Sequence, residues 1–244
     1  MAISESISRL RAYHARNGLL ATVRRAWLAA KRALFFRHCV LFYCDLSSLK
    51  GPAPDLPTSL TVERKRSASE LANEDLQAIT SFWSPELASR NLKQRFELGA
   101  SLWLIRSNGR LAGYGWTLKG GTVEPHYFPL GADDVQFLDF HVFPKYRGRA
   151  IDWFLMTHIL HTLAAEGLAR ALGEAAEWNA ASLASFRMTP FRHLGTASKF
   201  PLFGHTLIWW PKLQINLPVI AHWTRNERQT ARDHSHTPKP RAVV

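Results

Sequence analysis

The sequence predicts a mixed α/β domain in which helices pack against a sheet. Hydrophobic residues make up 46% of the 244 residues, which is typical of a globular chain. Short segments with strand-like alternation are interleaved with segments whose apolar residues recur at helical spacing. The pair Asn108 and Gly109 separates two such strands and predicts a tight hairpin, because both residues tolerate positive φ angles. Strands and helices that alternate in this way indicate a layered α/β or α+β fold.

The expected elements divide the chain into three parts. Strands are expected over residues 39–44, 60–64, 101–106, 110–118, 135–143, 170–176, 191–198 and 204–210. One or two helices are expected over residues 7–38, and further helices over 69–83, 85–98, 152–166 and 182–188. The parts are a basic helical extension with a proline-rich linker (1–58), a globular domain (59–215) and a basic tail (216–244) that we expect to be disordered.

Apolar spacing supports the first of these elements. Leu20, Val23 and Trp27 recur at three- and four-residue steps, which predicts an amphipathic helix in the extension. Residues 39–44 are mostly apolar and predict a short buried strand. Residues 60–64 alternate apolar and polar side chains, as a half-buried strand does.

The later elements follow from the same patterns. Pro85 suits the first turn of the helix over 85–98, and Gly167 ends the long helix over 152–166. In the strand over 135–143, Val135 and Phe137, and less regularly Asp139, are expected on one face.

The formal net charge of +12 favours anionic partners such as nucleic acid, anionic lipid or a phosphorylated ligand. No acidic residue occurs from Arg9 to Arg37. The helix expected there can pack on the domain, lie on a membrane surface, or bind a partner or nucleic acid, and the sequence leaves these alternatives open. No apolar run is long enough to predict a transmembrane helix, and the first residues lack the pattern of a signal peptide.

The two cysteines, Cys39 and Cys44, are expected to be reduced. Residues five apart in a strand point to opposite faces, which disfavours a disulfide bond. No second cysteine pair exists to complete a zinc site. We therefore expect a cytoplasmic protein without a metal.

The segment from Phe140 to Asp152 carries the chemistry that is easiest to predict. A strand ends, a short loop with Arg147, Gly148 and Arg149 follows, and a helix begins. Unpaired N–H groups and the helix dipole attract anions at a helix N-terminus. Gly148 lets a ligand approach the backbone, and the arginines add charge. The loop therefore predicts a diphosphate site.

This segment resembles the acetyl-CoA pyrophosphate loop of the GNAT superfamily of acyltransferases. In that family the pattern is Arg or Gln, two residues of any type, Gly, one residue of any type, and Gly or Ala. Arg147, Ala150 and Asp152 take the three defined places here. Two of them depart from the pattern, because Ala150 adds a methyl group and Asp152 adds a carboxylate beside the expected diphosphate.

A second resemblance lies about 30 residues downstream. Asn179, Ser182 and Phe186 match the places where the family has an Asn that contacts the pantetheine arm, a small residue, and a Tyr that often protonates the leaving thiolate. Phe186 cannot donate a proton. The resemblance covers roughly residues 60–210 and implies a GNAT-like mixed, mostly antiparallel sheet flanked by helices. The cofactor contacts that it implies are Phe140, Val142, Arg147, Gly148, Arg149, Ala150, Ile151, Asp152, Asn179, Ser182 and Phe186.

The resemblance also implies a function. We expect an N-acyltransferase that moves an acetyl or other acyl group from acyl-CoA to an amine of a small molecule or sugar. The candidate general bases are Glu174, Asp139 and His141, since the family often places its base on these strands. The alternative is a catalytically weak or inactive module that binds a CoA ester or a partner, because the Tyr is missing. Nucleic-acid binding is the least expected function.

Overall fold

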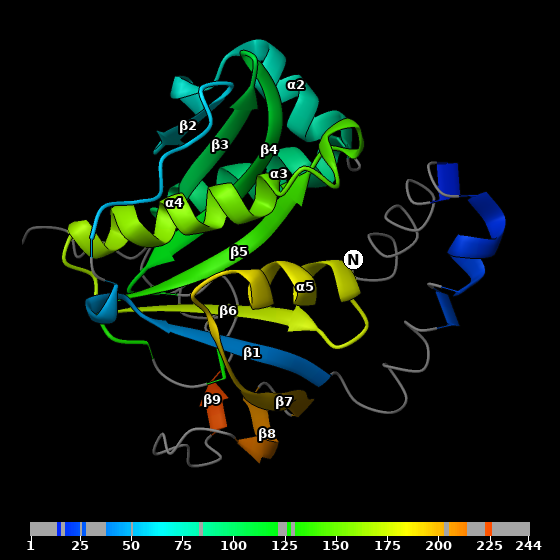
Figure 1. Ribbon diagram of the computed structural model, residues 1–244. Coiled ribbons are helices and arrows are strands. Elements are labelled where there is room, and N and C mark those ends of the chain that lie inside the picture. The colour runs from blue at the N-terminus through cyan, green and yellow to red at the C-terminus, as the bar shows by residue number, and fades with distance from the viewer. Residues whose placement is uncertain are drawn as a thin grey trace, which may run out of the picture.

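A computed structural model of the chain describes residues 14–15, 18–24, 26–27, 38–49, 51–82, 85–121, 126–127, 130–202, 205–213 and 223–225. Its strands are β1 (His38–Asp45), β2 (Leu60–Lys65), β3 (Ser101–Ser107), β4 (Arg110–Lys119), β5 (Asp134–Val142), β6 (Arg170–Ala176), β7 (Arg192–Leu202), β8 (His205–Leu213) and β9 (Trp223–Arg225). Its longer helices are α2 (Asn73–Phe82), α3 (Pro85–Glu97), α4 (Ile151–Ala165) and α5 (Ala180–Met188), and Figure 1 shows their arrangement.

The described strands form one mixed sheet in the order β2-β3-β4-β5-β6-β1-β7-β8-β9. Strands β5 and β6 are parallel, and the other neighbouring pairs are antiparallel. Helix α4 is the crossover that parallel strands require. The prediction of a mixed, mostly antiparallel sheet with flanking helices is confirmed.

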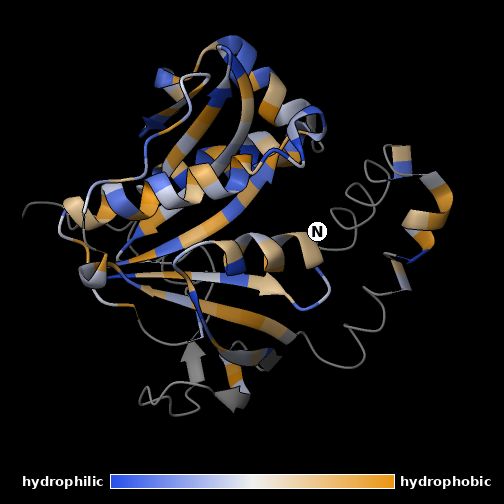
Figure 2. Ribbon diagram, viewed as in Figure 1, coloured by the Kyte–Doolittle hydropathy of each residue, from blue (hydrophilic) through white to orange (hydrophobic). Residues whose placement is uncertain are grey.

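Helices cover both faces of this sheet. In β3, Trp103 and Ile105 pack with α4, whereas the alternate residues Leu102 and Leu104 pack with α2 and α3. Residues 102–105 of this strand are therefore all apolar, and Figure 2 shows the middle of the ribbon in hydrophobic colours. Helix α4 crosses in front of β3 and β4 in Figure 1. The sheet thus has an apolar core on each face, covered by α4 on one side and by α2 and α3 on the other.

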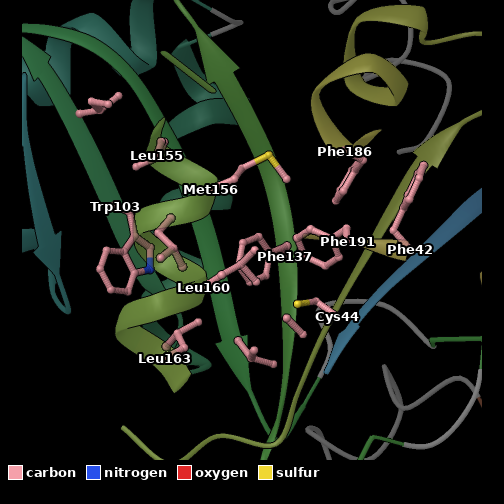
Figure 3. Close-up of a cluster of buried hydrophobic side chains, with 14 of the residues drawn as sticks. Phe42, Cys44, Trp103, Phe137, Leu155, Met156, Leu160, Leu163, Phe186 and Phe191 are labelled. Atoms are coloured by element: carbon pink, nitrogen blue, oxygen red, sulfur yellow. The ribbon is translucent and has the colours of Figure 1, made fainter. Parts of the chain in front are cut away.

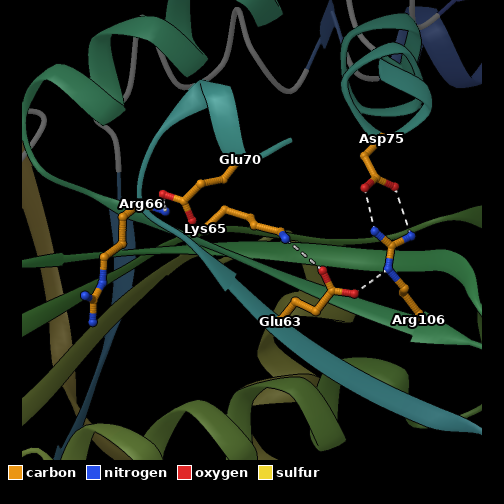
Figure 4. Close-up of polar contacts among 6 residues, drawn as sticks. All are labelled: Glu63, Lys65, Arg66, Glu70, Asp75 and Arg106. Atoms are coloured by element: carbon orange, nitrogen blue, oxygen red, sulfur yellow. Dashed lines mark hydrogen bonds and ion pairs between the residues drawn. The ribbon is translucent and has the colours of Figure 1, made fainter. Parts of the chain in front are cut away.

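An ion-pair network fixes the edge of the sheet to α2. The Arg106 guanidinium donates to both carboxylate oxygens of Asp75, at 3.1 and 2.5 Å, and to Glu63 Oε1 at 2.8 Å (Figure 4). Asp75 is only 4% exposed, so its charge needs this partner. The hydrogen bond from Lys65 and the Arg106 contact lower the pKa of Glu63. This network holds α2 over the face of the sheet opposite α4.

Strand β1 lies in the middle of the sheet, between β6 and β7. Residues 38–45 were expected to belong to the extension, but their backbone pairs with β6 on one side and β7 on the other. Cys39, for example, lies opposite Ala176 of β6 and Ala197 of β7. These residues therefore belong to the same sheet as the later strands. Cys44 packs on the α4 side of the sheet and Cys39 on the opposite side, and neither cysteine forms a disulfide bond, as expected.

Two further expectations change at element ends. Helix α2 begins at Asn73 rather than 69, because residues 68–70 form a 3-10 turn in which Ser67 Oγ donates to Glu70. Strand β9 falls within the tail that was expected to be disordered, and Trp223 pairs with Leu207 of β8. The expected helix over 7–38 is helical at residues 14–15, 18–24 and 26–27, and its remainder lies outside the described residues. Among the helices that the structure describes, none has the length and hydropathy needed to cross a membrane.

Candidate functional site

The sheet opens between β5 and β6. Their parallel pairing runs from Asp134–Arg170 to Phe137–Gly173 and ends there. Beyond this point the two strands diverge toward their C-terminal ends (Figure 1). A ligand strand or chain that enters this gap can bond to the edge of β5, because those backbone groups are not used by β6.

A β-bulge in β5 sets the direction of this edge. Tyr114 pairs with His141 and Trp116 with Leu138, so Asp139 and Phe140 together stand opposite Gly115. Asp139 takes a left-handed φ of 42° at this place. The bulge reverses the side-chain alternation, and the expectation that Asp139 shares a face with Phe137 is therefore wrong. Its carboxylate instead forms an ion pair with Arg95 of α3, on the opposite face.

Phe140 takes the place that simple alternation assigns to Asp139. Its ring stacks on Phe137, with 5.3 Å between ring centroids, and lies over Gly115. A Cβ at Gly115 would come within 2.4 Å of this ring, so only glycine allows the approach. The bulge and Gly115 together allow the Phe140 ring to lie against β4.

The loop after β5 has the form of an anion site. Gly148 and Ala150 both have positive φ, 75° and 53°, and Arg147 and Arg149 are exposed. No side chain caps α4, and its first internal bond runs from the Phe154 N–H to Ala150 O. The N–H groups of residues 151–153, in the first turn of α4, can thus donate to an anion. Ala150 occupies a conformation that suits glycine, which agrees with the glycine of the family pattern at this place.

The carboxylate of Asp152 is turned away from this loop. Ser185 of α5 donates a hydrogen bond to Asp152 Oδ2. From the sequence, this carboxylate was expected beside the diphosphate. The bond to Ser185 holds it against α5, so the conflict with a bound anion is reduced.

Asn179 and Ser182 are brought together at the start of α5. Asn179 Oδ1 accepts from the Ser182 N–H at 3.3 Å, and its Nδ2 donates to Ser182 Oγ at 2.7 Å. The pair forms a helix cap, which is the ordinary role of Asn before a helix. Contact with a cofactor stays a prediction for both residues.

Phe186 lies in a row of stacked rings on the α4 face, and Figure 3 shows this row. Its ring is parallel to that of Phe42, with 4.4 Å between centroids, and meets Phe191 edge-on at 5.0 Å. Phe191 meets Phe137 in turn at 5.1 Å. A Cβ on Gly173 would lie 2.5 Å from Phe186, so the ring rests directly on β6 where the strands part. Phe186, at the family's Tyr position, is thus a buried aromatic residue that lines the gap.

The three candidate bases lie on the face opposite α4. Glu174 Oε2 is 3.6 Å from Lys199 Nζ of β7. His141 packs between Tyr114 and Phe143, at centroid distances of 5.6 and 5.5 Å. Asp139 is held by Arg95, as described above. Glu174 and His141 therefore flank the gap from its two sides, β6 and β5.

Sequence patterns did not indicate the cations and rings around these groups. Lys199 Nζ lies 4.1 Å from the centroid of the Tyr127 ring, next to His126. His126 is 4% exposed, and burial, together with the charge of Lys199, lowers its pKa to about 3. These contacts join residues that are distant in sequence, so no local spacing could have revealed them.

Other kinds of site are not supported in the described part of the chain. There, no three His, Cys, Asp or Glu side chains are grouped as metal ligands. A small cavity at the far end of the sheet is lined by Arg64, Ser101, Thr117 and Glu166 among others. This cavity lies at the C-terminal end of α4, away from the β5–β6 gap.

The model of the Acetyltransferase (GNAT) family matches residues 68–189, which is half of the chain. No curated protein matches the sequence.

Solved structures resemble the chain at low identity. A tandem GNAT protein from the clavulanic acid biosynthesis pathway is 16% identical with a TM-score of 0.48, over 68% of this chain and 55% of that one. A GCN5-related N-acetyltransferase from Sphaerobacter thermophilus is 16% identical with a TM-score of 0.46, over 70% and 54%. One from Kribbella flavida is 14% identical with a TM-score of 0.41, over 72% and 71%. The chain thus spans about half the length of the first two.

Proposed function

Because the chain belongs to the GNAT acetyltransferase family, we propose that it transfers an acyl group from acyl-CoA to an amine acceptor. The observation that carries the proposal is the combination of the uncapped α4 N-terminus with the open edge of β5 beside it. An anionic diphosphate and an extended amide-bearing arm are the two parts of coenzyme A that such a site can accept.

The residues present fit this ligand. The loop N–H groups, Arg147 and Arg149 would hold the diphosphate, and the edge of β5 from Phe140 to Val142 would bond to the pantetheine arm. Phe186 and the rings beside it form an apolar wall for that arm. Bound acyl-CoA supplies the activated thioester; all other parts of the reaction fall to the protein.

The acceptor side of the gap offers one suitable base. Glu174 would accept a proton from the incoming ammonium group, directly or through water, so that the neutral amine forms the new C–N bond as the C–S bond breaks. Asp139 is a weaker candidate, since Arg95 donates a hydrogen bond to it directly, whereas Lys199 Nζ is 3.6 Å from Glu174 Oε2. With Phe186 in place of a phenol, the departing thiolate receives, through water, the proton that the amine nitrogen loses as the amide forms.

One observation favours a second function. Phe186 is packed at the place where the family often has a proton donor, so a module that binds a CoA ester without turnover is the alternative. The two functions share the binding site and differ only in thioester turnover.

The experiment that tests the proposal is calorimetric titration with acetyl-CoA, at low and moderate salt. We expect saturable binding, and we expect Arg149→Glu to weaken it more than about tenfold, because a carboxylate replaces a guanidinium beside the diphosphate. Arg66→Glu makes the same charge change at an exposed arginine beyond β2, at the other end of the sheet, and should bind like the unaltered chain.

Equal affinity of the two variants would exclude the loop as the phosphate site. Binding without release of thiol in the presence of any amine would favour the non-catalytic alternative. Binding that disappears at moderate salt would reduce the interaction to general charge attraction.

A further inference from the structure

The basic segment (residues 9–37) presents an apolar stripe that the rest of the described chain leaves uncovered. Its described residues 18–24 and 26–27 are helical. The exposed fractions are 68% for Leu19, 85% for Leu20, 57% for Val23 and 69% for Trp27. At 3.6 residues per turn these four side chains fall within roughly 100° of one another. Figure 2 shows the hydrophobic colouring of this helical part.

The charged residues of the basic segment are all positive. The segment contains eight Lys or Arg residues and no Asp or Glu. Arg24 follows Val23 directly and is exposed, so a cation borders the apolar stripe. A helix with an apolar stripe, a basic remainder and a Trp has the composition of helices that lie in a lipid–water interface.

The basic segment joins the fold at the end of the sheet that carries the site. It continues into β1 at His38, and Cys39 pairs with Ala176, the last residue of β6. The open ends of β5 and β6 and the N-termini of α4 and α5 lie at the same end (Figure 1). The helical residues 18–24 and 26–27 are therefore joined to this end of the sheet through residues 28–37 of the chain.

We propose that the basic segment docks on an anionic membrane surface, with the apolar stripe in the interface and the arginines on the lipid headgroups. Nucleic acid would satisfy the charges but leave the four apolar side chains in water. An apolar protein groove would cover the stripe but would not require eight cations. The anionic bilayer accounts for both features.

The test is co-sedimentation of the full chain with vesicles. Vesicles of phosphatidylcholine alone are compared with vesicles containing about a third phosphatidylglycerol, at low and moderate salt. We expect binding to the anionic vesicles that weakens as salt rises. Leu20→Glu should reduce partitioning more than about tenfold, and Arg24→Gln about fivefold, in line with about 1 kcal/mol for each basic residue at an anionic surface.

Two variants serve as matched controls. Leu98→Glu changes a 47% exposed leucine after α3, and Arg66→Gln an exposed arginine after β2, both at the far end of the sheet. Both controls should bind as the unaltered chain does, and circular dichroism establishes that all four variants are folded.

Three results would overturn the proposal. They are no binding to anionic vesicles, equal binding to both kinds of vesicle, and equal losses in the control variants. Tight binding of a double-stranded oligonucleotide with no vesicle binding would assign the segment to nucleic acid instead. Acetyl-CoA titration of Leu20→Glu separates this proposal from the acyl-transfer proposal, because cofactor affinity should not change.

Discussion

Ala150 shows how a single residue can depart from a family pattern and still keep its backbone. Its φ of 53° is the left-handed conformation that favours glycine, and it begins α4 without a side-chain cap. The resemblance predicted a glycine place here, and the backbone angle gives the physical reason. The cost of that angle for a residue with a Cβ is about 1 kcal/mol.

Ala150→Gly should therefore raise the free energy of unfolding by about 0.5–1 kcal/mol, since glycine takes this angle without strain. Urea denaturation at neutral pH measures the change. Ala165→Gly, at the last position of α4, should have the opposite sign because glycine weakens a helix. A loss of stability at Ala150 would mean that the methyl group contributes packing that outweighs its strain.

Glu174 is the residue on which the proposed chemistry depends. Glu174→Gln keeps the shape of the side chain near Lys199 but cannot accept a proton. We expect turnover with an amine panel, measured by thiol release, to fall by about 10²–10⁴-fold while acetyl-CoA affinity stays within about twofold. Glu177→Gln, at an exposed position just after β6, is the control and should keep full activity. Full activity of Glu174→Gln would remove this residue as the base.

At the scale of elements, the sequence predicted most strands and helices but not the bulge that changes the side-chain alternation in β5. Periodicity located the strand over residues 134–142 within one residue, because apolar spacing reports which side chains are buried. It assigned Asp139 to the wrong face, since a bulge adds a residue without changing the composition. The partners of the candidate bases, Arg95 and Lys199, were missed for a related reason, because they come from other elements.

The bulge gives an element-scale prediction. Gly115→Ala places a Cβ within 2.4 Å of the Phe140 ring, so either β4 or the bulge must shift. We expect a loss of about 1–3 kcal/mol in the free energy of unfolding, and weaker acetyl-CoA binding.

Gly121→Ala is the matched control for that change. The nearest atom to its added Cβ is 4.0 Å away, so stability and affinity should stay close to those of the unaltered chain. Thermal unfolding and calorimetry compare the two variants. Similar behaviour of both would show that β5 does not depend on the close approach of Phe140 to Gly115.

At the scale of the whole molecule, the sequence predicted the fold class but not the place of β1. A strand at residues 39–44 was visible as a short apolar run, yet its pairing partners, β6 and β7, begin more than 100 residues later. Local patterns carry no information about such distant pairing. The insertion of β1 brings His38, where the basic segment joins the fold, to the end of the sheet that carries the site, which a division of the chain at residue 58 does not reveal.

The buried face around His126 gives the molecule a predictable response to pH. Burial is the main cause that lowers the pKa of His126 to about 3, Lys199 lowers it further, and Asp134 opposes them. The ordinary histidine pKa is 6.5, so below that pH the unfolded chain binds a proton that the folded chain does not. This contribution to stability is fully present above the unfolded pKa and is lost as pH falls below it.

Between pH 7 and pH 5, this single group should lower the free energy of unfolding by about 2 kcal/mol. Urea denaturation at the two pH values measures the loss in the unaltered chain. His126→Gln removes the titrating group, so its stability should change less over the same interval, even if its absolute stability is lower. The interval from pH 5 to pH 7 lies above the pKa of ordinary carboxylates. The pKa of Glu63 is lowered further, so Glu63 keeps its charge and its ion pairs throughout this interval. His14→Gln, at an exposed position, should keep the full pH dependence, and an unchanged slope in His126→Gln would assign the acid sensitivity to other groups.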